Sequence, residues 1–221
     1  AIVLVLFQSG LRPGGLCGLK YGQVAEQLEE GKVPVQLRVT PDMDSKLFSY
    51  KLDYYVTWIQ GEAIQAVKAW VESKQGWTSE KPLFYTNRGN PYNSSTLFYY
   101  LRNCIRRAGL DVTKTSLYDL RKAFYNVLMR TQMDDPNFKE ALMGHKLPGS
   151  RGNYFDHHDF RTLEYEYMRA DLSRSVAKRE VTILREQMKE YEQALETQRL
   201  LSQPQVLEWI QTKMREEGLI E

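Results

Sequence analysis

The sequence predicts an α+β fold that is mostly α-helical, with one small antiparallel sheet of about three strands and a helical tail at the C-terminus. Two patterns lead to this prediction. β-branched and aromatic residues are concentrated between residues 33 and 59, as in strands. Nearly every later segment has the apolar spacing of a helix. With 221 residues, 42% of them hydrophobic and 26% charged, the chain can bury a core and is neither disordered nor collagen-like.

The N-terminal segment predicts a helix that ends in a turn. Its apolar run, residues 1–7, is much shorter than the roughly 20 residues that span a bilayer, and it lacks the basic start of a signal peptide. We therefore expect a soluble cytoplasmic protein without a membrane partner. The abrupt apolar start indicates a helix cut from a longer protein, so we expect an upstream domain. Glycines and Pro13 then break the helical pattern around Arg12.

The sheet is predicted from three short segments. Residues 33–40 and 47–59 are rich in β-branched and aromatic side chains, and the turn residues 41–45 lie between them. These two segments predict a hairpin. Residues 83–85, Leu-Phe-Tyr, predict a short third strand.

The remaining segments of the body predict helices. Residues 61–74, 94–109 and 116–131 have apolar side chains at helical spacing. A short helix follows Pro136, and another begins near Asp159.

After residue 172 the sequence changes in character. Apolar residues recur at spacings of four and three among many Gln, Glu and Arg, which is a heptad pattern. Its apolar positions are Ala177, Val181, Leu184, Met188, Tyr191 and Leu195. We therefore divide the chain into a domain at residues 1–171 and a helical tail at residues 172–221, a candidate oligomerisation segment. Such a seam needs a partner, which is either another chain or the body of the same domain.

Charge and cysteine content say little about function by themselves. The formal net charge is +2, which is mild for a protein that binds nucleic acid. Residues 102–122 hold more basic than acidic side chains, but a basic stretch is more often a solvated helix surface. Only two cysteines, Cys17 and Cys104, are present, which argues against a disulfide scaffold and against a Cys-rich metal site.

Four short motifs carry the candidate chemistry. They are Ser9-Gly10-Leu11-Arg12, Tyr118-Asp119-Leu120-Arg121-Lys122, Leu142-Met143-Gly144-His145 and Gly152-Asn153-Tyr154-Phe155. Taken singly, each has an ordinary structural interpretation, such as a surface arginine, a loop histidine or a packed tyrosine. Their order and spacing are more specific, because His145 follows Arg121 by 24 residues and Tyr154 follows His145 by 9.

In this order the motifs resemble the catalytic domain of the tyrosine recombinase (phage integrase) family, over roughly residues 1–170. The motifs Leu-Arg-Lys and Met-Gly-His-Lys look more like those of archaeal or mobile-element integrases than those of bacterial chromosome-dimer resolvases. The resemblance implies the fold of that domain and a site-specific recombinase that cleaves and rejoins DNA through a 3′-phosphotyrosine. It implies no metal, ATP or other cofactor. It further implies double-stranded DNA as partner and a homo-oligomer, a tetramer on DNA, in which the tail makes protein contacts.

The resemblance also implies a role for each residue. Tyr154 is the nucleophile, and Arg12 and Arg121 bind the non-bridging phosphate oxygens through charge-assisted hydrogen bonds. A lysine at the hairpin tip protonates the leaving 5′ oxygen, with Lys46 as the first candidate and Lys51 as the second. The implied role of His145 is to donate to a phosphate oxygen or to orient the attacking tyrosine.

Tyr118 departs from the family pattern, which usually has histidine three residues before the second arginine. A phenol with a reference pKa near 10 is no general base at neutral pH, although it can donate a hydrogen bond. We therefore expect Tyr118 to contact phosphate or to pack. The departure leaves two other functions open, namely a weakened or inactive DNA-binding protein of the same fold and a relaxation activity like that of type IB topoisomerases.

Two alternatives concern other residues near the motifs. Tyr165 and Tyr167 lie 20 and 22 residues beyond His145, which is too far for the family's nucleophile. His157 and His158 could join His145 in a metal site. No Cys or carboxylate cluster at ligand spacing supports such a site, so a solvated histidine pair is the simpler interpretation and we expect no metal.

Overall fold

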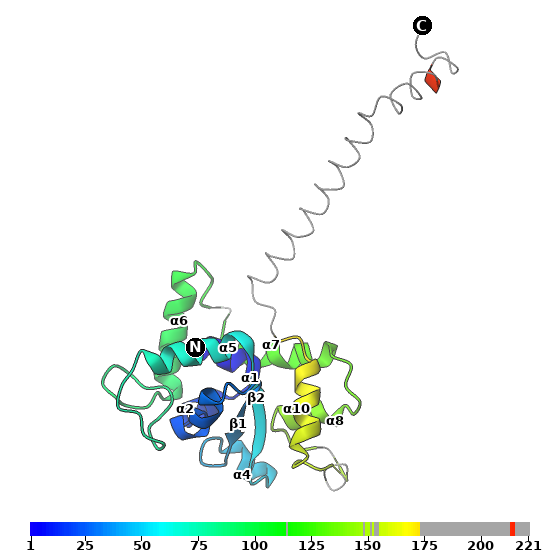
Figure 1. Ribbon diagram of the computed structural model, residues 1–221, viewed down its shortest axis with the longest axis horizontal. Helices are drawn as coiled ribbons and strands as arrows, with labels where there is room; N and C mark the ends of the chain where they lie inside the picture. The colour runs from blue at the N-terminus through cyan, green and yellow to red at the C-terminus, as the bar shows by residue number, and fades with distance from the viewer. Residues whose placement is uncertain (114, 148, 151, 153–154, 173–212, 215–221) are drawn as a thin grey trace. The chain divides into compact units, whose positions relative to one another are not determined.

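The computed structural model describes residues 1–113, 115–147, 149–150, 152, 155–172 and 213–214 (Figure 1). It confirms a mostly helical fold with one small antiparallel sheet. The elements are α1 (Ile2–Ser9), α2 (Pro13–Cys17), η1 (Tyr21–Gln23), α3 (Ala25–Glu29), β1 (Val35–Val39), α4 (Lys46–Tyr50), β2 (Tyr55–Ile59), α5 (Gly61–Glu72), α6 (Ser94–Arg107), α7 (Leu117–Arg130), α8 (Asn137–Leu142) and α10 (Phe160–Arg169).

The two strands pair in antiparallel register, with Val35 opposite Ile59 and Val39 opposite Tyr55. The expected second strand at residues 47–59 is wrong over its first half, because α4 and a short loop occupy residues 46–54. Leu47 explains the difference. Its side chain is fully buried in the core, which draws this segment into a helical turn instead of an exposed strand.

The expected third strand is also wrong. In the described residues, the segment around 83–85 makes only two isolated bridges, between Lys20 and Pro82 and between Tyr85 and Pro91. Both bridges end on proline, which has no backbone N–H and cannot extend a ladder of hydrogen bonds. Leu83 and Phe84 are apolar because they are buried in the core.

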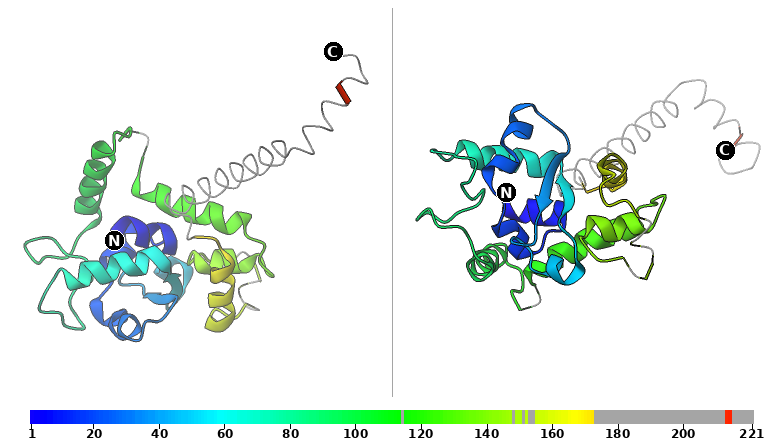
Figure 2. Two further views of the ribbon diagram at one scale, coloured as in Figure 1. Left: turned by 45° about the horizontal axis from the view of Figure 1, so that its top comes forward. Right: turned by 90° about the horizontal axis from the view of Figure 1, so that it is seen from below.

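Helix α1 and strand β2 form the centre of the folded body. All five residues of β2 are buried, and the strand contacts α1, α8 and α10 as well as β1. Helix α1 also contacts α5 and α7, and Figure 2 shows it (dark blue) between them. The C-terminal end of α1, where Arg12 follows, is therefore held inside the molecule.

The longer helices begin where the sequence places them. Helix α6 begins with a capping box between Asn93 and Thr96, and α7 begins with one between Ser116 and Asp119. Helix α8 follows Pro136, and Asp159 caps α10 by accepting a hydrogen bond from the N–H of Thr162 at 3.1 Å.

Gln8, near the end of α1, fastens the last described residue of the body. Its Nε2 donates to the carbonyl of Leu172 at 3.3 Å, and its Oε1 accepts from the N–H of Gln60 at 2.9 Å. Its own carbonyl accepts from the hydroxyl of Tyr167 at 3.1 Å. Gln8 thus joins α1 to the end of β2, to α10 and to the chain just beyond α10.

The predicted heptad seam lies outside the described residues, so the tail and its boundary at residue 172 stay predictions. Lys213 and Met214 are described there, and both are helical. Within the described part of the chain, no helix has the length and apolar character needed to cross a membrane.

Candidate active site

Arg121 lies at the centre of the candidate site. Its side chain enters the interior from the first turns of α7, and the residue is only 6% exposed. Nη1 donates to the carbonyl of Gly10, and Nη2 donates to the carbonyl of Met143 at 2.6 Å and lies 3.1 Å from Nε2 of His145. One guanidinium therefore joins the turn before Arg12 to the turn before His145.

Both of these turns require glycine. Gly10 ends α1 at φ 63°, and a Cβ there would lie 2.2 Å from the ring of Phe124. Gly144 follows α8 at φ 62°, and a Cβ there would lie 2.5 Å from the ring of Tyr55. A positive φ and a closely packed ring together exclude any side chain. The two carbonyls that hold Arg121 are therefore fixed by glycine turns packed against aromatic rings.

Arg12 is held by a carboxylate that the sequence did not reveal. Its Nη1 donates to Oδ2 of Asp44 at 2.6 Å, and the two side chains are 14% and 4% exposed. The other oxygen of Asp44 accepts from the backbone N–H of Lys46 at 3.1 Å. Asp44 therefore connects the first arginine to the start of α4.

The electrostatics of this cluster favour an anion. Burial lowers the pKa of Arg121, and the positive charge of Arg12 lowers it further. The negative charge of Asp44 raises the pKa of Arg121, but the carboxylate forms its ion pair with Arg12. Among the described residues, Arg121 has no carboxylate of its own. Glu140 is separated from Arg121 by the ring of His145, so no carboxylate contacts the guanidinium of Arg121 directly, and a buried charge is costly until it is paired.

His145 is held on its other side by Glu140. Nδ1 of His145 lies 2.6 Å from Oε2 of Glu140, and the side chains are 31% and 30% exposed. Oε1 of Glu140 accepts from the hydroxyl of Tyr125 at 3.1 Å. Burial lowers the pKa of His145, while the hydrogen bond to Glu140 raises it.

The two candidate lysines lie at the ends of α4. Lys46 is its first residue and Lys51 follows its last at φ 56°, and both are exposed. Among the described residues, neither Nζ takes part in a hydrogen bond or ion pair. The segment that connects β1 to β2 contains helix α4, whereas the sequence predicted a simple hairpin tip.

Tyr118 stays outside the buried cluster. It is 54% exposed and lines an open pocket with Pro13, Ser94, Ser95 and Leu117. Tyr118 is thus not packed in the core, and its expected contact with phosphate stays a prediction.

Tyr154 lies outside the described residues, so its position is not part of this geometry. The ring of Phe155, the next residue, packs edge-on against Phe138 with centroids 5.3 Å apart. The rival Tyr167 is fully buried against Trp58, and burial raises its pKa well above the ordinary value. Tyr165 is 60% exposed on α10. Tyr167 is therefore a core residue, and the nucleophile assignment to Tyr154 stays a prediction.

The remaining histidines pack against aromatic rings. His157 lies 5.0 Å from Phe155 and His158 lies 5.3 Å from Tyr54, measured between ring centroids. Among the described residues, no group of three or more His, Cys, Asp or Glu side chains is placed to hold a metal ion.

Three residues of the site were missed in the sequence. Asp44 carried a weak signal, as an acidic residue in the turn before a candidate lysine, and Glu140 lies one helical turn before the Gly-His pair. Tyr55 carried none. Its hydroxyl is fully buried beside the guanidinium of Arg121. Burial raises the pKa of Tyr55. The charges of Arg121 and Arg12 lower it, and the charge of Asp44 raises it.

Comparison with known proteins gives both family and fold matches. Residues 1–161 match the Phage integrase family. The crystal structure of XerA recombinase aligns with a TM-score of 0.53 and 23% identity, over 77% of this chain and 55% of that one. The Tn1549 transposon integrase in complex with circular intermediate DNA aligns with a TM-score of 0.48 and 17% identity, over 75% and 55%.

The likeness to XerA recombinase shows a shared fold. This chain spans 55% of the length of each of these two solved proteins, or about half. A search of curated proteins finds no match.

Proposed function

The chain belongs to the phage integrase family, and from that premise we propose that it is the catalytic part of a site-specific DNA recombinase. The observation that carries the proposal is the pair of guanidiniums of Arg12 and Arg121, of which Arg121 is buried and only Arg12 has a carboxylate partner, Asp44. A phosphodiester brings the missing negative charge, and its two non-bridging oxygens suit guanidinium donors.

Arg121 keeps donors for such a substrate. A guanidinium has five N–H groups, and the contacts with Gly10, Met143 and His145 account for three of them. Because these contacts already fix the guanidinium, little reorganisation is needed when charge develops on the phosphate oxygens.

The proposed reaction has two reversible steps. Tyr154 attacks the scissile phosphorus and loses its hydroxyl proton to solvent, while the bond from phosphorus to the 5′ oxygen breaks. Lys46 or Lys51 gives that oxygen its proton. The product is a 3′-phosphotyrosine and a free 5′ hydroxyl. In the second step a 5′ hydroxyl gives its proton to that lysine and attacks the phosphorus, while the bond from phosphorus to the phenolic oxygen breaks and the phenolate takes a proton from solvent. The DNA is thereby rejoined without ATP.

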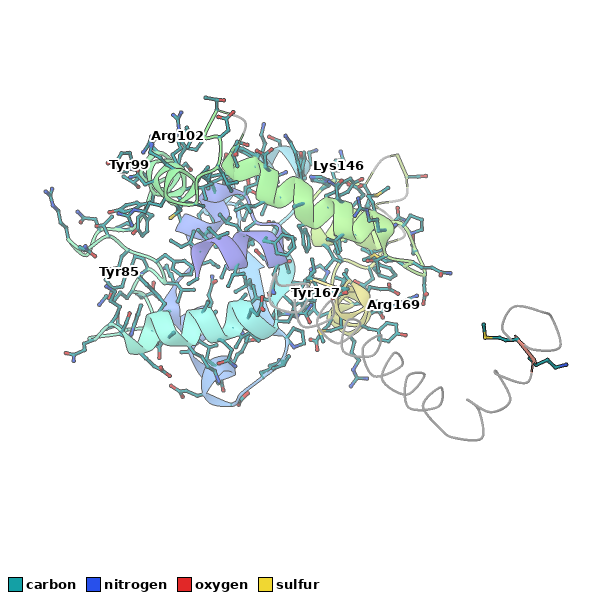
Figure 3. The ribbon with its side chains drawn as sticks, turned by 90° about the horizontal axis from the view of Figure 1, so that it is seen from above. Tyr85, Tyr99, Arg102, Lys146, Tyr167 and Arg169 are labelled. Atoms are coloured by element: carbon teal, nitrogen blue, oxygen red, sulfur yellow. The ribbon has the colours of Figure 1, made fainter. Side chains whose placement is uncertain are left out.

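Helix α6 supports double-stranded DNA as the substrate. Its 14 residues include Arg102, Arg106 and Arg107 and no acidic side chain. Tyr99 is 64% exposed on the same helix, and Figure 3 shows Tyr99 and Arg102 on α6, away from α10. The first residues of α6 line the open pocket of Tyr118. We infer that phosphates on either side of the cleaved bond contact this helix, with the salt dependence typical of such contacts.

The test uses supercoiled plasmid in EDTA, which avoids the need for a known target site. We expect the wild-type chain to relax the plasmid and to leave a covalent protein–DNA adduct after a detergent quench. Tyr154→Phe should lose both, whereas the control Tyr165→Phe, which removes an exposed hydroxyl, should retain them. Equal activity of wild type and Tyr154→Phe would show that Tyr154 is not the nucleophile. Relaxation without strand exchange on paired target sites would favour the topoisomerase-like activity.

Tyr118 favours a second candidate, a DNA-binding protein of this fold that has lost catalysis. DNA binding without any adduct, in a chain extended upstream, would support it. Tyr118→His tests the role of Tyr118. We expect DNA cleavage by this variant to be unchanged or faster, and complete loss of cleavage would contradict the role given to Tyr118.

A further inference from the structure

A chain of hydrogen bonds runs from Tyr125 through Glu140 and His145 to Arg121. The hydroxyl of Tyr125 lies 3.1 Å from Oε1 of Glu140, and Oε2 of Glu140 lies 2.6 Å from Nδ1 of His145. Nε2 of His145 lies 3.1 Å from Nη2 of Arg121. Both ring nitrogens of the histidine are therefore engaged.

The chemistry of the two outer groups determines where the imidazole proton lies. An ionised carboxylate can only accept a hydrogen bond, and a guanidinium can only donate one. Nδ1 must therefore carry the hydrogen, and Nε2 must present its lone pair to Arg121. A protonated imidazole would direct an N–H at the guanidinium and lose this contact.

We propose that Glu140 is a positioning residue, which fixes His145 in the tautomer with hydrogen on Nδ1 so that Nε2 holds the guanidinium of Arg121 in place for the phosphate. The role in catalysis rests on the proposed function, whereas the tautomer does not. The assignment also changes the role of His145, since its Nε2 has no hydrogen to donate to a phosphate oxygen while it holds Arg121.

The surroundings of His145 support this arrangement. The backbone N–H of His145 donates to the carbonyl of Glu140 at 2.9 Å, so the two residues form one rigid unit at the end of α8. Burial and the negative charge of Glu140 raise the pKa of Tyr125, which stays a protonated donor. Burial and the charges of Arg121 and Arg12 lower the pKa of His145 against the effect of Glu140, so the neutral ring is favoured.

Glu140→Gln tests the proposal with almost no change of shape. An amide can accept through its oxygen or donate through its nitrogen, so the variant permits both tautomers. We expect two-bond ¹H–¹⁵N NMR spectra to show one tautomer in the wild type and a mixture in Glu140→Gln. The pKa of His145 should fall, because the variant lacks the anion that stabilises imidazolium. Cleavage at saturating DNA should slow by roughly 10- to 100-fold, on the scale of the loss known for carboxylates that orient metal-bound histidines.

Two further variants serve as controls. Glu30→Gln removes the same charge from an exposed position after α3, and it should leave both the tautomer and the rate unchanged. Tyr125→Phe keeps the ring and removes one hydrogen bond to Glu140. The carboxylate of Glu140 still only accepts, so the hydrogen should stay on Nδ1 of His145 and the rate should fall less than in Glu140→Gln.

Unchanged tautomer populations in Glu140→Gln would overturn the proposal, as would a changed tautomer with an unchanged cleavage rate. If the wild-type chain cleaves no DNA, the proposed function fails instead. The NMR spectra then still decide whether Glu140 sets the tautomer of His145.

Discussion

The two halves of the candidate site differ in how their side chains are held. Arg121 is buried and Arg12 is partly buried, and backbone carbonyls hold the first while a carboxylate holds the second. Lys46 and Lys51 are exposed, and their side chains make no hydrogen bond or ion pair within the described residues. The groups assigned to phosphate binding are thus held in place by the fold itself, whereas no described side-chain contact holds the groups assigned to proton transfer. Variants should separate the two halves by their effect on stability.

The largest loss of stability is expected from Arg121→Ala. It leaves the carbonyls of Gly10 and Met143 buried without their donor, and each such group costs roughly 1–3 kcal/mol. The free energy of unfolding should fall by about 2–6 kcal/mol, measured by urea denaturation. Arg130→Ala, an exposed position at the end of the same helix, is the control and should change it by less than about 0.5 kcal/mol. Equal effects of the two variants would contradict the central position of Arg121.

A smaller loss is expected from Gly144→Ala. The new Cβ meets the ring of Tyr55 at 2.5 Å and also has an unfavourable φ of 62°. The left-handed conformation costs about 1–2 kcal/mol and overpacking about 1–3 kcal/mol more. Gly149→Ala is the matched control, because Gly149 has the same φ of 62° and nothing within 4 Å. Melting curves should show the loss of stability from the left-handed conformation in both variants, and the further loss from overpacking in Gly144→Ala alone.

The lysine variants should barely change stability. Lys46→Ala and Lys51→Ala alter exposed side chains, so each should change the free energy of unfolding by less than about 0.5 kcal/mol. One of the two should nevertheless slow cleavage by roughly 100- to 10,000-fold, as expected for a lost general acid. A substrate with sulfur at the 5′ bridging position needs no proton on its leaving group. It should restore the rate of the variant that lacks the acid, and rescue of neither variant would exclude both lysines.

The smallest effect is a pH dependence from the buried half. Burial lowers the folded-state pKa of His145 below that of the unfolded chain, so the unfolded state takes up a proton first as the pH falls. The contribution of neutral His145 is complete above the reference pKa near 6.5 and is lost as the pH falls below it. The pKa of His157 is also lowered by burial, so His157→Gln is the comparison that isolates His145. Stability that rises toward lower pH in both proteins would contradict this sign.

Local patterns in the sequence predicted the parts of the fold that are determined locally. Helices α6 and α7 begin at capping boxes formed by neighbouring residues, and both were placed to within about two residues, the usual uncertainty of helix ends. The expected strand at 47–54 was wrong because the burial of Leu47 decides that segment. Burial depends on distant elements and has no local signature.

The candidate site likewise has residues that local motifs identify and residues that only their contacts reveal. The four motifs identified Arg12, Arg121 and His145, and the structure brings these three residues to one cluster. Asp44 and Glu140 were missed because an acidic residue in a turn or a helix is ordinarily solvated. Only their partners, 32 and 5 residues away along the chain, reveal that they are bound within the site.

The C-terminal end of α1 makes two separate contacts, one through Gln8 and one through Gly10. The stretch from Gln8 to Gly10 supports the chain where it leaves the body at Leu172, and it also supplies the carbonyl that holds Arg121. The contacts at Leu172 and at Arg121 therefore start from residues only two positions apart in the chain, Gln8 and Gly10. Two hydrogen bonds and the two peptide bonds from Gln8 to Gly10 are therefore the whole path between the carbonyl of Leu172 and the guanidinium of Arg121.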